Sequence, residues 1–283
     1  RDYYASRGLG DVYKRQTQGI FAVESAVNEL AHKMGMDPVK VKEMNMPVEG
    51  GPLPGYPDVP YAQSCSMDRC MARAKEMMDW DSKYPCRDMG NGKVRGVGVA
   101  MAMQGSSIAG VDVGGADIKL NEDGSYTLAL GCTDMGTGCD TVMAQIAADC
   151  LNTPMDNIVV FSVDTDISPY DSGSYASSTT YITGKAVEMA CAKLKTQLCG
   201  IAAGMLGCST EEVVFENGRV KQINTEKSVS LAEISVKDQV NNDIAAVATA
   251  SHSSPVSPPP YMVGMVEIEL DKDTGCLLYT SPS

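Results

Sequence analysis

The sequence is poor in aromatic and basic residues. Of its 283 residues only 6% are aromatic, with 3 Phe and 1 Trp, whereas 18 are Met. We therefore expect an aliphatic core whose gaps are filled by methionine. Only 23 Lys and Arg stand against 36 Asp and Glu, a formal net charge of -13. That balance disfavours binding to nucleic acid or to an anionic membrane, because both need a cationic surface.

The sequence also lacks the usual metal-binding patterns of cysteine and histidine. Its 10 cysteines form no Cys-x-x-Cys pair, and its 2 histidines, His32 and His252, lie far apart. A zinc site or an iron–sulfur cluster of the usual spacing is therefore not expected. Cysteines scattered in this way are typical of reduced thiols in a cytosol. No apolar run is long enough to span a bilayer, and no basic-then-apolar leader that would suggest export opens the chain. We therefore expect a cytoplasmic protein.

The two ends of the chain are related through DNA. Residues 11–16 and 276–281 can be encoded by the two strands of one DNA segment, read in different frames. Such a segment is typical of a transposase adapter used in sequencing libraries. We therefore expect residues 1–16 and 276–283 to be non-native, and residues 17–275 to be an internal fragment of a longer protein.

The pattern within 17–275 mixes helices and strands. Apolar spacing predicts helices near 20–34, 67–80, 139–151 and 177–198, with short helices after Asp37-Pro38 and at 230–236. Strands are expected at 97–103, 116–120, 126–130, 158–163 and 263–270, with hairpin turns at 121–124 and 216–218. Residues 47–60 are predicted to be a linker or loop. The fold class is α+β, with mixed sheets and packed helices, and we place a domain boundary near Asp88–Gly92, between domains 17–92 and 93–275.

The first candidate site is the glycine-rich stretch Gly131–Gly138, between a strand and a helix. Glycines allow close approach of a ligand, and the helix start offers unpaired N–H groups and partial positive charge to a phosphate. The Thr137 hydroxyl adds a donor. The same residues also fit a tight turn capped by Thr137.

The second candidate is the hydroxyl-rich stretch Ser172–Thr180, where the side chains either cap a helix or surround a polyanionic cofactor. Neither Lys nor Arg occurs from Asn121 to Gly184, and no Gly-Lys-Ser/Thr motif is present. This argues against a P-loop nucleotide site and favours a large, mostly neutral cofactor. Glu24 is expected to be solvated or to cap a helix, and no nucleophile–base pair can be assembled.

Taken in order, these segments resemble the molybdenum-binding large subunit of the xanthine dehydrogenase/aldehyde oxidase family. The resemblance covers nearly all of 17–275. The segments that carry it are residues 18–24, 28–31, 35–38, 131–141, 145–147, 164–177, 184–187 and 266–271.

The resemblance implies a molybdopterin cofactor, in bacteria often the cytosine dinucleotide form, whose molybdenum is held by dithiolene sulfurs rather than by side chains. It implies oxidative hydroxylation of a purine, an N-heterocycle or an aldehyde. Electrons would leave through Fe-S clusters and FAD on an iron–sulfur subunit and a flavin subunit, or on segments outside this chain, in an oligomer of heteromers.

Carried over by position, three groups of residues would face ligands. The residues that would lie against the pterin phosphates are Gly136, Thr137 and Gly138. Ala176 would lie beside the molybdenum, with Ser177, Thr179 and Thr180 near the cofactor. The residues that would face the substrate are Gln104, Ser106 and Ser107. Thr137 stands where the family usually has Gln, and Ser106 where animal purine enzymes have an aromatic residue. The family's catalytic Glu would fall beyond Gly275, so no catalytic residue is expected within the chain, and the fragment itself is expected to be inactive.

Two alternatives remain open at this stage. Within the same class, the protein could be a relative of aldehyde oxidoreductase, carbon-monoxide dehydrogenase or acyl-CoA reductase. From a different class, it could be a non-catalytic α+β binding domain whose two loops serve only as helix caps.

Overall fold

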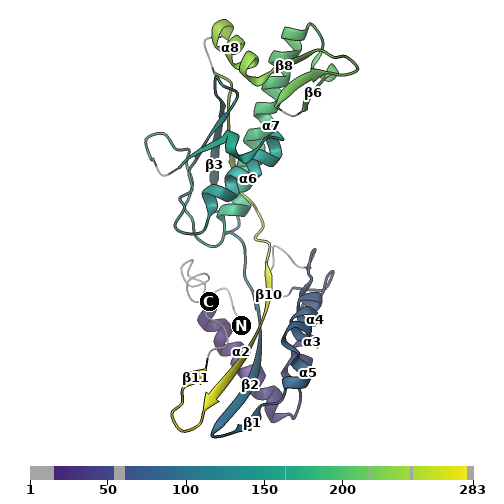
Figure 1. The fold of residues 1–283 in the computed structure, drawn as a ribbon, viewed down its shortest axis with the longest axis vertical. Coiled ribbons are helices and arrows are strands. Elements are labelled where there is room, and N and C mark those ends of the chain that lie inside the picture. The colour runs from purple at the N-terminus through teal and green to yellow at the C-terminus, as the bar shows by residue number, and fades with distance from the viewer. Residues whose placement is uncertain (1–15, 54–60, 163, 217, 243–244, 279–283) are drawn as a thin grey trace. The chain divides into compact units, whose positions relative to one another are not determined.

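The computed structural model describes residues 16–53, 61–162, 164–216, 218–242 and 245–278. The chain divides into two compact units, one of residues 1–105 and 258–283 and the other of residues 106–257 (Figure 1). No described helix is long and apolar enough to cross a membrane.

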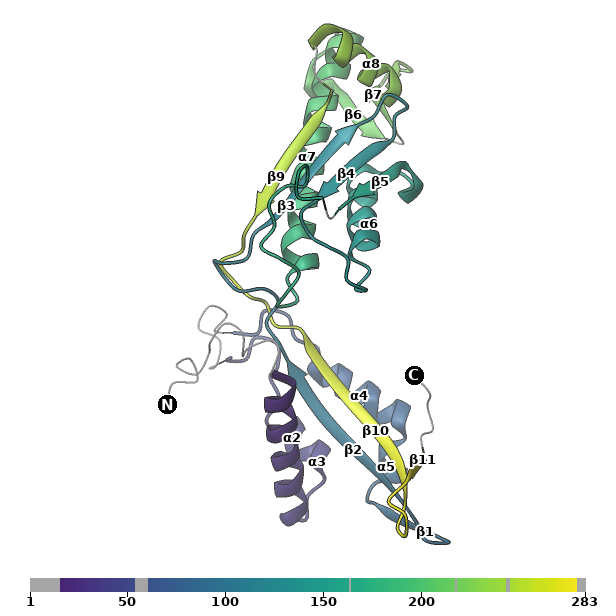
Figure 2. The same ribbon diagram turned by 90° about the vertical axis from the view of Figure 1, so that its left-hand side faces the viewer.

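The first unit is built on a long antiparallel ribbon. Strands β2 (Lys93–Met103) and β10 (Tyr261–Asp271) pair over their whole length, and the sheet order is β1-β2-β10-β11. The short outer strands are β1 (Arg87–Gly90) and β11 (Leu277–Leu278), and the helices are α2 (Gln16–Lys33), α3 (Pro38–Glu43), α4 (Met67–Met78) and α5 (Trp80–Lys83). Because side chains alternate along a strand, one face of the ribbon packs its apolar residues against Trp80 and Met71, and α4 lies along β10 (Figure 2).

A buried ion pair joins α2 and α3 to the free edge of β2. Lys42 Nζ lies 2.6 Å from Glu24 Oε2, and the Lys42 side chain has no exposed surface, against 14% for Glu24. The same Glu24 oxygen accepts the backbone N–H of Met101, and Asn28 Nδ2 donates to the Val99 carbonyl. β1 pairs only with residues 93–95 of β2, so further along the strand no described strand covers this side. Backbone groups on such an edge are unpaired, and α2 satisfies two of them. The prediction that Glu24 is solvated or caps a helix was therefore wrong.

We predict that Glu24→Gln lowers the free energy of unfolding by about 3 kcal/mol, because it leaves the Lys42 ammonium buried without its counter-charge. The Gln carbonyl can still accept the Met101 N–H, so the loss reports on the charge. Urea unfolding measures it, and Glu29→Gln is the matched control, since the Glu29–Lys33 pair on the same helix is 66% and 70% exposed. Glu29→Gln should lower the free energy of unfolding by less than about 0.5 kcal/mol. Equal losses in the two variants would contradict the prediction.

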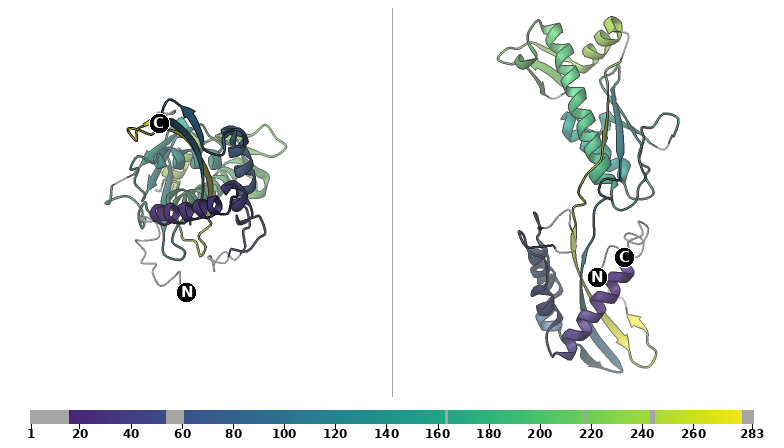
Figure 3. Two further views of the ribbon diagram at one scale, coloured as in Figure 1. Left: turned by 90° about the horizontal axis from the view of Figure 1, so that it is seen from below. Right: turned by 180° about the vertical axis from the view of Figure 1, so that it is seen from behind.

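The second unit is a one-sided sheet covered by two helices. Its strands are β3 (Gly114–Leu120), β4 (Tyr126–Leu130), β5 (Ile158–Phe161) and β9 (Val247–His252), in the order β5-β4-β3-β9. The hairpin β3–β4 is antiparallel, and β5 runs parallel to β4. Helices α6 (Cys139–Leu151) and α7 (Thr179–Leu206) lie on one face of the sheet (Figure 3).

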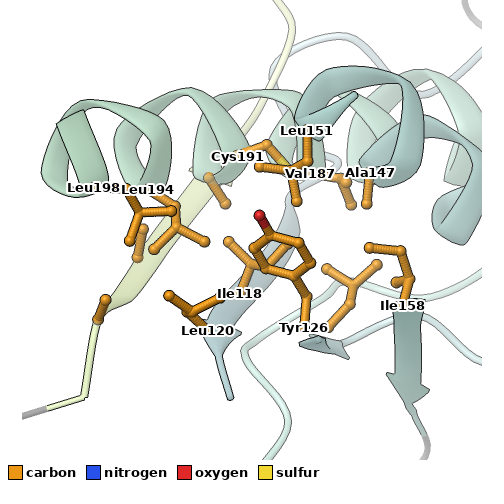
Figure 4. Packing of buried hydrophobic residues seen from close by; sticks show 14 of the residues in the cluster. Ile118, Leu120, Tyr126, Ala147, Leu151, Ile158, Val187, Cys191, Leu194 and Leu198 are labelled. Carbon is orange, nitrogen blue, oxygen red and sulfur yellow. The ribbon is translucent and has the colours of Figure 1, made fainter. Parts of the chain in front are cut away.

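The core of this unit follows from two periodicities. Tyr126, Leu128 and Leu130 alternate inward from β4, and Leu194 and Leu198 come from one stripe of α7. All five belong to one buried cluster, and Figure 4 shows Tyr126, Leu194 and Leu198 between sheet and helices. A smaller sheet, β6 (Val213–Glu216), β7 (Arg219–Gln222) and β8 (Ser228–Ser230), packs with α8 (Leu231–Asn242) beside the end of α7.

Most predicted elements are present, with differences at their ends. Helix 139–151 and strand 126–130 match their predicted bounds, and Asp37 caps α3 as expected. The helix predicted at 177–198 starts later and runs on to Leu206, and the one predicted at 230–236 runs to Asn242. Part of the predicted turn at Asp88–Gly92 is strand β1, and the compact units divide at 105/106 and 257/258. The domain boundary near Asp88–Gly92 stays a prediction. The 54–60 part of the predicted linker, Asn217 and most of both adapter-like ends lie outside the described residues.

Candidate functional site

The two candidate loops touch each other in the second unit. Gly131 follows β4, and a Cβ there would collide with the Pro169 carbonyl and lie 2.5 Å from Asp171 Cβ. Ser174 Oγ donates to the carbonyl of Thr133 at 3.2 Å. The loop before α6 and the loop before α7 are thus one joined structure, and only glycine at 131 permits the close approach.

Asp134 organises the first loop. Its Oδ1 accepts the backbone N–H groups of Gly136, Thr137 and Gly138 at 2.8, 3.0 and 3.2 Å. These bonds, chiefly that from Gly136, lower the pKa of the Asp134 carboxyl. A carboxylate at the start of α6 also complements the positive end of the helix. Asp134 therefore holds the loop, and the N-cap of α6 itself is Gly138, which has no side-chain cap bond. The expectation that Thr137 caps this turn was wrong; Thr137 is exposed.

The same loop holds the described cluster that comes closest to a metal site. One ligand atom each of Asp134, Cys139 and Asp140 lies within 4.8 Å of the others. Burial raises the pKa of the Cys139 thiol, so it is protonated at neutral pH and a poor ligand. Asp134 already accepts three N–H bonds. The donor set therefore does not favour a side-chain metal centre.

The second loop is held by hydrogen bonds from several sides. Asp171 accepts the N–H of Gly173 through Oδ1 and the hydroxyl of Thr183 through Oδ2, both at 2.8 Å. Ser107 donates its N–H to the Ala176 carbonyl at 2.9 Å. The loop is thereby fixed to α7 and to the segment that precedes β3.

Two consecutive residues of this loop have left-handed backbone. Ala176 and Ser177 have φ of 56° and 55°, a region that non-glycine residues rarely adopt, and such strain persists only where the surroundings impose it. Ala176 is buried, whereas Ser177 and Thr180 are exposed. The strained turn leads directly into α7.

The start of α7 has no side-chain cap. Its N-cap residue, Ser178, donates its hydroxyl backwards to the Tyr175 carbonyl at 2.8 Å and makes no cap bond to the helix. Thr179 and Thr180 form the first two residues of this 28-residue helix. The partial positive charge of this helix end is therefore not offset by a capping carboxylate.

The residues expected to face a substrate differ in their positions. Gln104 is half-buried in the first unit and donates its N–H to the Pro260 carbonyl at 3.3 Å. Ser106 and Ser107 belong to the second unit. Ser107 is completely buried with φ of 86°, and its carbonyl accepts the Ser257 hydroxyl. Within this chain Ser107 supports the second loop.

Sequence reasoning missed the two aspartates that shape the loops. Asp134 and Asp171 each stand two residues before a glycine, Gly136 and Gly173. In both places the carboxylate accepts the N–H two residues on, which is an Asx turn. The Asp-x-Gly spacing was the available signal.

The described residues fit a large cofactor with a mostly neutral surface. Gly136 and Gly138 have φ of 98° and 75°, and a Cβ on either would meet nothing within 4 Å, so the backbone there is open to a ligand. The adjoining loop supplies the hydroxyls of Ser177, Thr179 and Thr180 at an uncapped helix start. N–H groups and hydroxyls at such a place can hold phosphate without Lys or Arg.

These loops and this fold define a cofactor-binding domain. The family model for the molybdopterin cofactor-binding domain matches residues 73–278, and the chain belongs to that family. The predicted family and the predicted α+β class are confirmed.

Curated relatives are similar over most of this chain. It is 32% identical over 268 residues to the probable hypoxanthine oxidase of Escherichia coli, covering 91% of this chain and 28% of the relative. It is 28% identical to the putative xanthine dehydrogenase molybdenum-binding subunit of the same species, covering 94% and 36%. It is 29% identical to the nicotine 6-hydroxylase large subunit of Paenarthrobacter nicotinovorans, covering 82% and 29%. The chain thus spans about a third of the length of these relatives.

Solved structures have the same fold. Carbon-monoxide dehydrogenase from Oligotropha carboxidovorans matches with a TM-score of 0.78 at 23% identity, over 93% of this chain and 35% of that one. Quinoline 2-oxidoreductase from Pseudomonas putida matches with a TM-score of 0.74 at 20% identity, over 92% and 35%.

We predict that the start of α6 loosens in acid as Asp134 protonates. Since folding lowers the pKa of this carboxyl, its stabilisation is complete above the ordinary value of about 4 and is lost as pH falls through the lower folded value. Hydrogen exchange at residues 136–140 should therefore gain extra opening below about pH 4. Asp134→Asn, which keeps a neutral acceptor, should lack that acid-dependent gain. An identical acid response in the variant would contradict the assignment.

Proposed function

We propose that this chain is the cofactor-binding part of a molybdenum hydroxylase large subunit, and that the whole protein is an oxidoreductase. The observation that carries the proposal is the joined pair of loops, open at Gly136 and Gly138 and leading into an uncapped α7. The family match supports it. A purely structural pair of capped turns would not need a strained Ala176–Ser177 turn beside an uncapped helix.

The cofactor we propose is molybdopterin, in its cytosine dinucleotide form. Ser177, Thr179 and Thr180 would hold its phosphates at the start of α7, because that helix end carries no competing carboxylate. Gly136 and Gly138 would approach the elongated ligand closely. We infer that Thr137, whose backbone N–H is already taken by Asp134, contributes its hydroxyl alone. Dithiolene sulfurs would hold the metal, in keeping with the poor side-chain donor set around Cys139.

When bound, the molybdenum centre supplies oxidative hydroxylation of an electron-poor carbon. The residues of this chain hold and orient the cofactor. Ala176, small and buried at 5% exposure, would pack beside the metal without offering it a ligand. Asp171 fixes the loop that carries Ala176 through Gly173 and Thr183.

The substrate class we favour is a purine or a related N-heterocycle. Relatives named for hypoxanthine, xanthine and nicotine support this choice, whereas an aldehyde oxidoreductase subunit is similar at 27% identity. Gln104, Ser106 and Ser107 would belong to the substrate side, with Ser107 acting through its support of Ala176.

Partner subunits follow from the electron balance of the proposed reaction. Oxidation of the substrate releases two electrons, and no described cysteine set here has the spacing of an iron–sulfur cluster. We infer an iron–sulfur subunit and a flavin subunit with Fe-S and FAD, in a cytoplasmic heteromer. A relative named as subunit gamma of a dehydrogenase complex, 29% identical, supports a multi-subunit assembly.

The function is tested on the full-length gene product, purified with its partner subunits. We expect bound molybdenum and pterin, and dye reduction with hypoxanthine or a pyridine N-heterocycle exceeding that with an aromatic aldehyde. Preference for the aldehyde would favour the aldehyde oxidoreductase alternative. A full-length protein without molybdenum or pterin would leave the non-catalytic binding domain.

We predict that Thr180→Val in the full-length protein lowers molybdenum and pterin content severalfold. The substitution keeps the β-branched shape and removes an exposed hydroxyl beside the start of α7. Metal analysis and released-pterin fluorescence measure the loss. Thr196→Val is the matched control, because Thr196 is an exposed threonine further along α7 whose hydroxyl only donates to the Ala192 carbonyl. Equal loading of the two variants would contradict phosphate binding at Thr180.

A further inference from the structure

The serine- and proline-rich segment 253–257, which follows β9, contains two serines with restricted backbone. Ser254 and Ser257 each stand directly before a proline, and a proline disfavours every backbone conformation of the preceding residue except the extended one. Ser254 is buried and Ser257 is half-buried, whereas Ser253 is exposed. The two restricted serines are therefore the ones that can contact other parts of the second unit.

The Ser254 hydroxyl joins this segment to the start of α7. It donates to the Val256 carbonyl at 2.9 Å and accepts the Val256 N–H at 3.2 Å. Its oxygen also lies 3.0 Å from the hydroxyl of Tyr181. Because a serine hydroxyl has a single proton, Tyr181 is the donor in this last bond. Tyr181 is the third residue of α7, so the segment is fixed to the first turn of that helix.

The same segment holds the residues that precede β3 at two points. The Ser254 carbonyl accepts the N–H of Gly110 at 2.8 Å, and the Ser257 hydroxyl donates to the Ser107 carbonyl at 2.8 Å. Ser107 in turn donates its N–H to the Ala176 carbonyl at 2.9 Å. Ser257 is therefore connected to the strained turn before α7 through one intervening residue.

Together these contacts form a closed ring. The ring follows the chain from Ala176 to Tyr181, crosses to Ser254, follows the chain to Ser257, crosses to Ser107 and returns to Ala176. Its part between Ala176 and Tyr181 carries the three hydroxyls that we propose to hold phosphate. Ser107 and Ala176 have φ of 86° and 56°, and such backbone persists only where the surroundings impose it. The ring supplies those surroundings.

We propose that Ser257 and Tyr181 are positioning residues of the cofactor site, an inference that rests on the proposed function. Ser257 acts through Ser107 on Ala176, and Tyr181 acts through Ser254 on the segment that carries Ser257. Without the Ser257 hydroxyl, the carbonyl of the completely buried Ser107 loses this donor, and the strained turn can relax. The phosphate-binding hydroxyls stay in place, so the cofactor should still bind while its surroundings at Ala176 change.

The first test measures hydrogen exchange in the full-length protein, on peptides that span residues 104–110 and 174–182. Ser257→Ala should speed exchange of both peptides severalfold, because Ser107 and Ala176 lose their connection to the segment 253–257. Ser253→Ala is the matched control, an exposed serine of the same segment, and should exchange like the parent. Unchanged exchange in Ser257→Ala would overturn the inference. The measurement needs no bound cofactor, so it stands apart from the proposed function.

The second test uses the full-length protein with its partner subunits. Ser257→Ala should keep molybdenum and pterin content within about twofold of the parent, whereas kcat falls about tenfold at nearly unchanged KM. The electron paramagnetic resonance spectrum of the reduced metal should also shift. Loss of molybdenum in proportion to kcat would make Ser257 a merely structural residue and overturn the inference, as would a variant that matches Ser253→Ala. A parent protein without molybdenum or pterin would instead contradict the proposed function.

A double variant tests whether the contacts act as one ring. Tyr181→Phe keeps the aromatic ring, removes the hydroxyl that donates to Ser254, and should speed the same exchange. Because either substitution opens the ring, Tyr181→Phe combined with Ser257→Ala should exchange no faster than the faster single variant. If the two effects multiply instead, the contacts are independent and the ring does not exist as proposed.

Discussion

The close approach of Gly131 to the loop before α7 is the constraint on which the site depends. A side chain at this position would overlap Pro169 and Asp171, and the two loops could not then share the Ser174–Thr133 hydrogen bond. The sheet sets this approach, because β4 delivers Gly131 at its end. Because Gly131 has no Cβ, the loops before α6 and α7 can lie in contact and form one surface.

The regular elements could be predicted because their residues carry local signals. Tyr126–Leu130 alternates, Asn121–Gly124 is a hairpin turn, and Asp37-Pro38 is a helix start; each is satisfied within a few residues of itself. The ion pair of Glu24 with Lys42 could not be predicted in the same way. It exists because β2 has a free edge opposite α2, and that edge is known only once β2 and β10 have paired.

In the candidate site, too, features with a local sequence signal could be predicted, and features that depend on distant contacts could not. Gly136, Gly138 and the hydroxyls before α7 could be selected from sequence, because glycine and hydroxyl residues at a helix start have few roles. Which side chain holds the loop before α6 could not be selected from a preference for Thr, because Asp134 reaches three loop N–H groups at once. The burial of Ser107 was likewise hidden, since it depends on Ala176, which is distant in sequence. Strain at Ala176 and Ser177 has no sequence signal at all.

The difference between the two helix starts gives the site a direction. Before α6 the Asp134 carboxylate occupies the N–H groups of the loop, so a second anion there would meet repulsion. At α7 no carboxylate caps the helix, and a long helix leaves partial positive charge at its first turn. Because Lys and Arg are absent from Asn121 to Gly184, this contrast sets the local preference for charge. This contrast supports the proposal that the phosphates of the cofactor lie at α7 and its neutral part over Gly136 and Gly138, whereas the resemblance alone places residues 136–138 against the phosphates.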